Sequence, residues 1–272
     1  MYFLRGFEVL KFFQVSAFTD RVFGGNPAGV CLLKNSWPAD LLLQNIAMQI
    51  NLSETVFVLD KAGEFFIRWF TPTVEVDLCG HATLAAAHVL FGKLGSENLV
   101  FKSSKYSLPV KKQNNLILLD FPAAELVKLA LGDVPNCFGK LAKEVWTGHD
   151  EYLLVYENED DVKNAVCDLE LAKNIQKSGF IITARSNEAG VDFVSRYFGP
   201  KIGIDEDPVT GSAHTLLVPY WQQVMGKDEF RARQVSKRGG ELFLKAKGDR
   251  VEIAGEAVTF LEGTICVREI LT

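Results

Sequence analysis

Hydrophobic and polar positions along the chain fall mostly into short runs that are typical of β-strands. Alternating or continuous apolar runs of about four to eight residues predict strands, because alternate side chains of an extended segment face the core. In the first part of the chain, such runs cover residues 12–18, 29–33, 55–59, 65–70, 99–102 and 116–121. In the second part, they cover residues 180–184, 191–198, 230–235, 240–246, 250–253, 257–260 and 264–267.

Four segments have the pattern of α-helices instead. They are residues 40–50, 82–93, 169–177 and 213–225. The second and the fourth are apolar almost all round, which is typical of a helix that is buried on every side. Gly-Gly at 239–240 and Gly-Asp at 248–249 separate expected strands and predict hairpin turns. The pattern as a whole predicts strands arranged around buried helices.

A degenerate internal repeat is the most informative feature of the chain. Residues 68–77 and 196–205 both read Arg-aromatic-Phe-x-Pro-x4-Asp, and the two copies lie about half the chain length apart. Each copy leads through a polar loop to a glycine and an apolar helix, and the second copy has three extra residues before its glycine. The repeat predicts two similarly folded halves, each made of strands around a helix.

Composition and charge narrow the class of protein. The 272 residues are 48% hydrophobic and 23% charged, as in soluble globular proteins. A net charge of −5 without a Lys/Arg block argues against nucleic-acid binding. Charges interrupt the apolar N-terminus, and no uncharged apolar run is long enough for a membrane span. The five widely spaced cysteines include no CxxC pair. We therefore expect a cytoplasmic protein with free thiols.

The glycines that end the two repeat copies, Gly80 and Gly211, stand where helices are expected to begin. A helix start has about four unpaired N–H groups and roughly half a positive charge, and glycine lets a ligand approach the backbone. This pattern predicts an anion site at each helix start, and two such starts facing each other would suit one carboxylate. The residues alone equally allow ordinary helices, with Asp207 and Ser212 as caps.

Four motifs support a resemblance to a known family. They are Asn26-Pro-Ala-Gly-Val-Cys, Asn51-Leu-Ser-Glu-Thr-Val-Phe-Val, Phe70-Thr-Pro with Asp77-Leu-Cys-Gly-His-Ala-Thr-Leu-Ala, and Glu206-Asp-Pro-Val-Thr-Gly-Ser-Ala-His. Together they resemble the phenazine-biosynthesis-like PhzF family of the diaminopimelate epimerase and proline racemase superfamily. The resemblance implies an α+β fold of two pseudo-symmetric halves, each a curled, mostly antiparallel sheet around a central helix. We place the halves at residues 1–121 and 122–272, with the last strand free to pack back on the first half.

The resemblance also implies a function. Family members are isomerases that use no metal and no organic cofactor and move a proton by acid–base chemistry. Carried onto this chain, Glu54 is the main general acid/base, Asp207 is its partner across a cleft between the halves, and His81 orients the substrate. The other expected substrate-binding residues are Asn26, Ser53, Gly80, Gly211 and Ser212. The implied partner is a small carboxylated substrate, and the family includes homodimers.

Other interpretations remain open from the residues alone. Glu54 could be an exposed charge at a strand end, Asp207 part of an exposed turn, and His81 a cap or a core residue. Cys79 is either a small buried residue or a thiol that assists, as in the racemase branch, where a cysteine stands at each helix start. The alternative functions are a cysteine-assisted amino-acid racemase or epimerase, and a non-catalytic protein that binds a small molecule or another protein.

Overall fold

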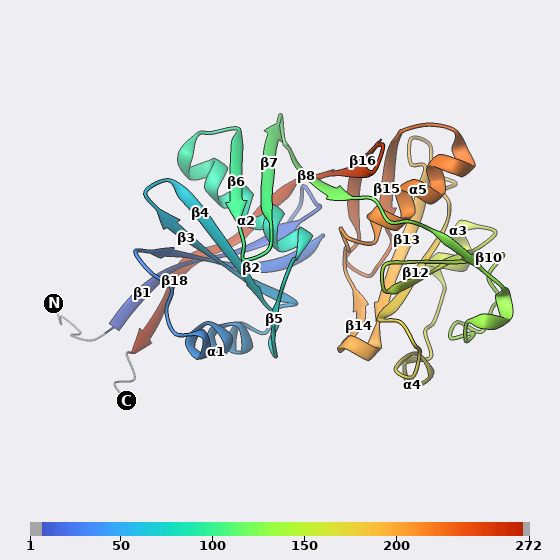
Figure 1. Ribbon diagram of the computed structural model, residues 1–272, viewed down its shortest axis with the longest axis horizontal. Coiled ribbons are helices and arrows are strands. Elements are labelled where there is room, and N and C mark those ends of the chain that lie inside the picture. Colours follow the sequence, from blue (N-terminus) through green and yellow to red (C-terminus); the bar gives the residue numbers. More distant parts are fainter. Residues whose placement is uncertain (1–6, 269–272) are drawn as a thin grey trace. The chain divides into compact units, whose positions relative to one another are not determined.

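The chain forms two compact units in the computed structural model, which describes residues 7–268 (Figure 1). Unit 1 holds β1 (Phe7–Ala17), residues 27–117 and β18 (Ala257–Arg268), and unit 2 holds residues 18–26 and 118–256. The segment 18–26 therefore groups with unit 2, whereas the sequence placed it in the first half. The reason is hydrogen bonding: Thr19 N donates to Glu256 O over 3.1 Å, and Gly25 N donates to Gly239 O over 2.8 Å.

Unit 1 is built from mixed parallel and antiparallel strand pairs. β2 (Asn26–Lys34) runs parallel to β3 (Glu54–Lys61), and β3 runs antiparallel to β4 (Glu64–Phe70). β4 pairs antiparallel with the short β5 (Glu75–Val76) and parallel with β6 (Asn98–Lys102), which continues to β7 (Ser107–Gln113). β1 pairs antiparallel with β18 along its whole length. The first and the last described strands of the chain thus complete the same unit.

The helix α2 (Gly80–Leu94) lies inside unit 1. Ten of its 15 residues are buried, and it contacts β1, β3, β7 and β18. Three consecutive alanines, 85–87, let the surrounding strands approach the helix closely. The expectation of a helix that is buried on nearly all sides is confirmed. The other helix of unit 1, α1 (Asp40–Ile50), buries only one face, through Leu43, Ile46 and Ala47.

Unit 2 repeats this plan with more strands. Its described strands are β8 (Leu116–Pro122, which begins in unit 1), β9 (Val127–Leu129), β10 (Glu144–Gly148), β11 (Glu151–Val155), β12 (Gly179–Arg185), β13 (Phe193–Gly199), β14 (Ile204–Asp207), β15 (Glu229–Gln234), β16 (Gly240–Lys247) and β17 (Arg250–Gly255). Its helices are α3 (Glu159–Lys163), α4 (Leu169–Ala172) and α5 (His214–Met225), with 3-10 turns at Leu131–Asp133 and Pro200–Ile202. Like α2, α5 is mostly buried.

The two units share one order of strand pairings. In unit 2, β11 and β12 are parallel, β12–β13 and β13–β14 are antiparallel, β13–β15 are parallel and β15–β16 are antiparallel. The pairings of β2 through β7 follow the same order. The repeated arginines also make equivalent ion pairs, Arg68 with Glu75 and Arg196 with Glu206, each at 2.6 Å. A two-fold rotation that superposes residues 68–95 on 196–226 stays a prediction.

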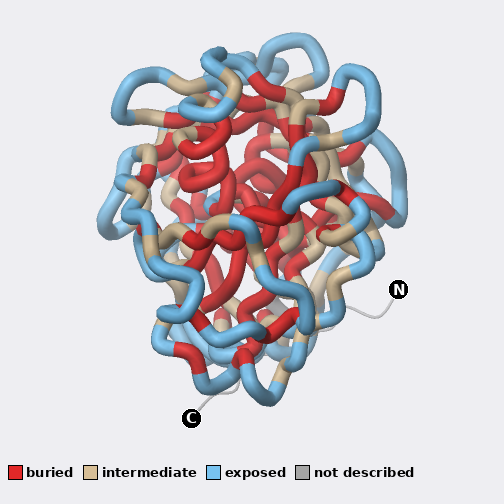
Figure 2. The backbone as a smooth tube through the Cα atoms, turned by 90° about the vertical axis from the view of Figure 1, so that its right-hand side faces the viewer, coloured by how far each residue is buried: buried red, intermediate tan, exposed pale blue. Residues whose placement is uncertain are grey.

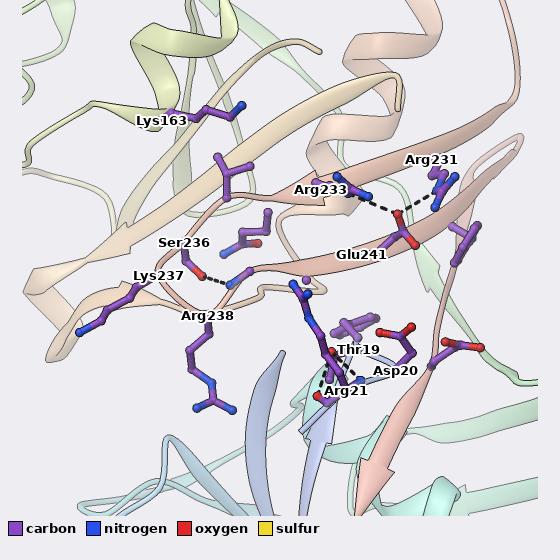
Figure 3. Close-up of a pocket in the computed structure, with 17 residues that line it drawn as sticks. Thr19, Asp20, Arg21, Lys163, Arg231, Arg233, Ser236, Lys237, Arg238 and Glu241 are labelled. Carbon is purple, nitrogen blue, oxygen red and sulfur yellow. Dashed lines mark hydrogen bonds and ion pairs between the residues drawn. The ribbon is translucent and has the colours of Figure 1, made fainter. Parts of the chain in front are cut away.

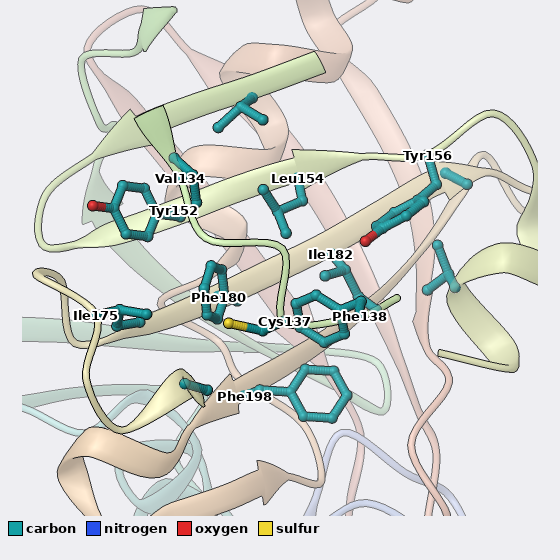
Figure 4. Close-up of a cluster of buried hydrophobic side chains, with 14 of the residues drawn as sticks. Val134, Cys137, Phe138, Tyr152, Leu154, Tyr156, Ile175, Phe180, Ile182 and Phe198 are labelled. Carbon is teal, nitrogen blue, oxygen red and sulfur yellow. The ribbon is translucent and has the colours of Figure 1, made fainter. Parts of the chain in front are cut away.

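The core of unit 2 is rich in aromatic side chains. One cluster holds Phe138, Tyr152 and Phe180, with ring centroids 5.4 and 5.6 Å apart (Figure 4). Beside α5, Phe193 stacks on Trp221 at 5.4 Å, and Trp221 Nε1 donates to Thr183 Oγ1. The buried segments lie inside a layer of exposed turns (Figure 2). These contacts fix α5, and therefore the loop that precedes it.

Several expected elements differ from the observed ones. The helix expected over 169–177 ends at Ala172, and the strands expected at 257–260 and 264–267 form one strand, β18. Gly263 interrupts the pattern but stays paired with Phe12 of β1, so the strand continues through it. Within residues 7–268, no helix is long and apolar enough to cross a bilayer.

Candidate functional site

The first group of candidate residues lies in unit 1 at the start of α2. Glu54 is the first residue of β3, Cys79 immediately precedes α2, and His81 is the second residue of that helix. His81 Nε2 lies 3.1 Å from Glu54 Oε2, and His81 Nδ1 lies 3.5 Å from Cys79 Sγ. The imidazole ring therefore stands between a thiol and a carboxylate. Two of the three expected catalytic residues, Glu54 and His81, are in contact.

Burial makes this contact electrostatically strong. The side chains of His81 and Glu54 are only 6% and 12% exposed. Burial opposes the charge on His81, but the contacts with Cys79 and Glu54 outweigh it and raise the His81 pKa well above its usual value. For Cys79, burial raises the pKa, and Glu54 adds to that effect. We therefore interpret the group as an imidazolium held by Glu54, with Cys79 on its other side.

The same three side chains offer one sulfur, one nitrogen and one oxygen ligand atom within 4.8 Å of one another. Zinc accepts such a set. However, the two ring nitrogens of His81 face different partners: Nε2 contacts Glu54, and Nδ1 contacts Cys79. A metal bound to either nitrogen would replace the contact that this nitrogen makes. The three side chains therefore contact one another in the order Glu54, His81, Cys79, and the absence of a metal stays an expectation.

We expect Cys79→Ala to lower the pKa of His81, because the substitution removes one of the two contacts that raise it. The measurement is an NMR titration of the His81 imidazole. Cys31→Ala is the matched control, since Cys31 is also a buried thiol of unit 1 but packs in the hydrophobic core beside α1. An unchanged His81 titration in Cys79→Ala would show that the thiol merely fills space.

The second group of candidate residues lies in unit 2 around Asp207, at the end of β14. Asp207 is only 6% exposed, so it is not part of an exposed turn. Asn26 Nδ2 donates to Asp207 Oδ1 over 2.8 Å and to the Val209 carbonyl over 2.9 Å. Thr210 Oγ1 donates to the other carboxylate oxygen, Oδ2. Two expected site residues that are 181 positions apart in the chain, Asn26 and Asp207, are thus directly bonded.

The sequence did not point to Gln234, which forms hydrogen bonds to the backbone of this group. Gln234 is 1% exposed, and its Nε2 donates to the Asp207 carbonyl over 2.8 Å. Its Oε1 accepts from Thr210 N over 2.8 Å. The only sequence signal is a polar residue at an inward position of a strand. Thr210 stands inside the quoted motif, but nothing in the motif indicates that it binds Asp207.

The start of α5 differs from an ordinary capped helix. The helix has no side-chain cap, so neither Asp207 nor Ser212 caps it. Gly211 and Ser212 form the turn before it, and His214 Nδ1 donates to the Thr210 carbonyl over 2.9 Å. At the start of α2, Thr83 Oγ1 makes the matching bond to the Cys79 carbonyl. Ser53 and Gly80 adjoin the first group in the chain, and the substrate-binding roles of these residues stay predictions.

The structure thus places Glu54, Cys79 and His81 together at the start of a helix enclosed by strands in unit 1, and a buried carboxylate, Asp207, before the matching helix of unit 2. The chain belongs to the PhzC-PhzF family, described as phenazine biosynthesis-like protein, which matches residues 15–263. The expected family and fold class are therefore confirmed.

Similar proteins support both the family and the fold class. An uncharacterized isomerase of Pseudomonas aeruginosa is 45% identical over 259 residues, which cover 94% of this chain and 98% of that protein. The crystal structure of a PhzF-family protein from Enterococcus faecalis has a TM-score of 0.89 and 39% identity, covering 95% of this chain and 99% of that one. A hydroxyproline epimerase from Agrobacterium vitis, 9% identical with a TM-score of 0.64, covers 97% of this chain and 93% of its own and shares the fold alone.

Proposed function

We propose that the protein is a cofactor-independent isomerase that moves a proton within a small carboxylated substrate, with Glu54 as the main general acid/base. The observation that carries the proposal is the buried contact of Glu54 with His81 at the start of α2, 3.1 Å between Oε2 and Nε2. A carboxylate that is held by an imidazolium in a nearly water-free setting is positioned for proton transfer. A charge with a purely structural role at a strand end needs no such partner.

In the proposed reaction, the Glu54 carboxylate takes a proton from an activated C–H bond of the substrate. The C–H bond breaks, an O–H bond forms on Glu54, and the electron pair stays on the conjugated system of the substrate. His81, as a cation, stabilises the negative charge that develops nearby. The O–H bond on Glu54 then breaks as a C–H bond forms at another carbon of the substrate, and Asp207, oriented by Asn26 and Thr210, is the second proposed acid/base group. The N–H groups near Gly80 and Gly211 would bind the carboxylate.

A deuterium-exchange experiment tests this proposal. The protein is incubated in deuterated water with a panel of unsaturated carboxylic acids and amino acids, without added metal or cofactor. We expect one class to acquire solvent deuterium at a single carbon, because the transferred proton exchanges while it resides on a carboxyl group. Tight binding of a panel member without any exchange would instead indicate a non-catalytic binding protein.

One observation favours a second candidate function, a cysteine-assisted racemase or epimerase. Cys79 Sγ lies 3.5 Å from His81 Nδ1, and a positive charge on His81 favours the thiolate form of Cys79. The matching position before α5 is Thr210 rather than a cysteine, and the nearby acidic group is Asp207. A two-thiol mechanism therefore lacks its second thiol. Loss of activity on alkylation of Cys79, with Glu54 dispensable, would support this candidate.

A further inference from the structure

Unit 2 contains a pocket of about 700 Å³ that the proposed reaction does not use (Figure 3). It lies on the outward face of β15 and β16. Along β15, Phe230, Ala232 and Gln234 are buried, whereas Arg231 and Arg233 are partly exposed and line the pocket. Gln234 also lines the pocket, but its side chain is hydrogen-bonded to Thr210 N and to the Asp207 carbonyl. None of the expected site residues of unit 2 lines this pocket.

The walls of the pocket are held by main-chain hydrogen bonds. Its lower wall is the loop 18–25, where the Phe18 carbonyl accepts from Glu241 N over 3.0 Å and Thr19 N donates to Glu256 O. Arg238 joins the same loop to β16 by donating to the Gly24 and Gly25 carbonyls over 2.7 and 2.8 Å. Gly240 permits this close approach, since a Cβ there would lie 2.9 Å from the Phe18 oxygen. The pocket is thus formed before any ligand arrives.

The pocket carries positive charge, although the whole protein has a net charge of −5. The lining holds six cations and three carboxylates, which are Arg21, Lys163, Arg231, Arg233, Lys237 and Arg238 against Asp20, Glu241 and Glu256. Four of the six are arginines. The guanidinium group is planar and matches the oxygens of phosphate in a two-point hydrogen bond.

The partners of these cations show which of them can bind a ligand. Arg231 and Arg233 share the single carboxylate of Glu241 at 2.8 and 3.4 Å, and Arg233 also pairs with Glu188 outside the pocket. Lys163 pairs with Glu159, which is also outside the lining. Among the described residues, Arg21 and Lys237 form no ion pair, and both are exposed. In Figure 3, Arg21 points from the loop into the pocket.

We propose that this pocket binds a small organic molecule that carries phosphate groups. The phosphates would lie between Arg21, Lys237 and Arg238, and the organic part would contact the apolar surface of Val235 and Phe243. The volume suits a metabolite of the size of a nucleotide, because ligand pockets usually measure about 300–1,000 Å³. The proposal is independent of the isomerase reaction, since neither Glu54 nor Asp207 takes part in it.

Isothermal titration calorimetry with ADP, pyrophosphate and adenosine tests the proposal. We expect ADP and pyrophosphate to bind at low ionic strength and adenosine, which has no phosphate, to bind far more weakly. Their affinity should fall as salt is added, since the cations are partly exposed. The double substitution Arg21→Glu and Lys237→Glu should weaken binding of ADP by about tenfold or more. Arg185→Glu is the control, since Arg185 is an exposed cation of unit 2 outside the lining.

Hydrogen exchange on the unmodified protein gives a second readout that needs no variant. Saturating pyrophosphate should slow amide exchange in residues 18–25 and 236–240. The proposal is overturned if no phosphate compound binds, if Arg185→Glu weakens binding as much as the double substitution does, or if protection appears elsewhere. In each case the test of the isomerase is unaffected, because deuterium transfer to a substrate is measured separately.

Discussion

Replacing Glu54 by glutamine should slow solvent-deuterium exchange into a substrate by roughly 10²–10⁴-fold, the usual contribution of general acid–base catalysis. Glutamine keeps the length and shape of the side chain and can still contact His81, but it cannot accept a proton from carbon. Binding of the substrate should therefore largely survive, and the loss should fall on turnover. Exchange rate and binding affinity are measured on the same substrate.

Two further variants make this result specific. Glu64→Gln is the matched control, because Glu64 is an exposed glutamate of unit 1 that pairs with Lys102, and it should leave exchange unchanged. Asp207→Asn should also slow turnover, since it removes the second proposed acid. If Cys79→Ala abolished exchange while Glu54→Gln retained it, the thiol rather than Glu54 would be the base.

Acidification should weaken the folded state by about 3 kcal/mol through His214 alone. Burial lowers the pKa of this side chain from 6.5 to about 4 in the folded protein. The unfolded chain therefore takes up the proton first, and about 1.4 kcal/mol is lost for each pH unit between the two values. The stabilisation is fully present above pH 6.5 and is lost as the pH falls toward 4.

Urea unfolding at pH 7 and at pH 4.5 measures this effect. The variant His214→Leu no longer titrates, so its stability should depend less on pH, even though it loses the bond to the Thr210 carbonyl and is less stable at neutral pH. His149→Gln serves as the control, because His149 is exposed. Equal pH dependence in His214→Leu and the unmodified protein would contradict the assignment.

The fold was predictable from sequence where local pattern and structure agree. The helix α1 has the expected bounds, and hairpins form at both expected turns, between β15 and β16 and between β16 and β17. Short strands such as β5, with two residues, have too few positions to show a period. Main-chain hydrogen bonds join the segment 18–26 to unit 2, and such bonds cannot be recognised from the sequence, because nearly every residue carries the same backbone groups.

The sequence identified most residues of the candidate site but not the contacts between them. Glu54 and His81 were expected from motifs, but their contact depends on the packing of β3 beside α2, which the sequence does not show. Asn26 and Asp207 were also expected, yet their bond links two distant segments that one sequence cannot align. Gln234 could not be found, because its role comes from the carbonyl and amide groups it contacts rather than from its neighbours in the chain.

The pairing of β1 with β18 has a consequence for synthesis on the ribosome. β1 is translated before unit 2, but its partner, Ala257–Arg268, is translated only after the residues of unit 2. Unit 1 therefore cannot be completed until unit 2 has been synthesised, although N-terminal domains commonly fold first. A fragment that stops at residue 256 leaves one edge of β1 unpaired, and exposed strand edges promote aggregation. Nascent chains of this protein should therefore depend on chaperones until β18 has emerged, and expression of the first half alone should yield insoluble material.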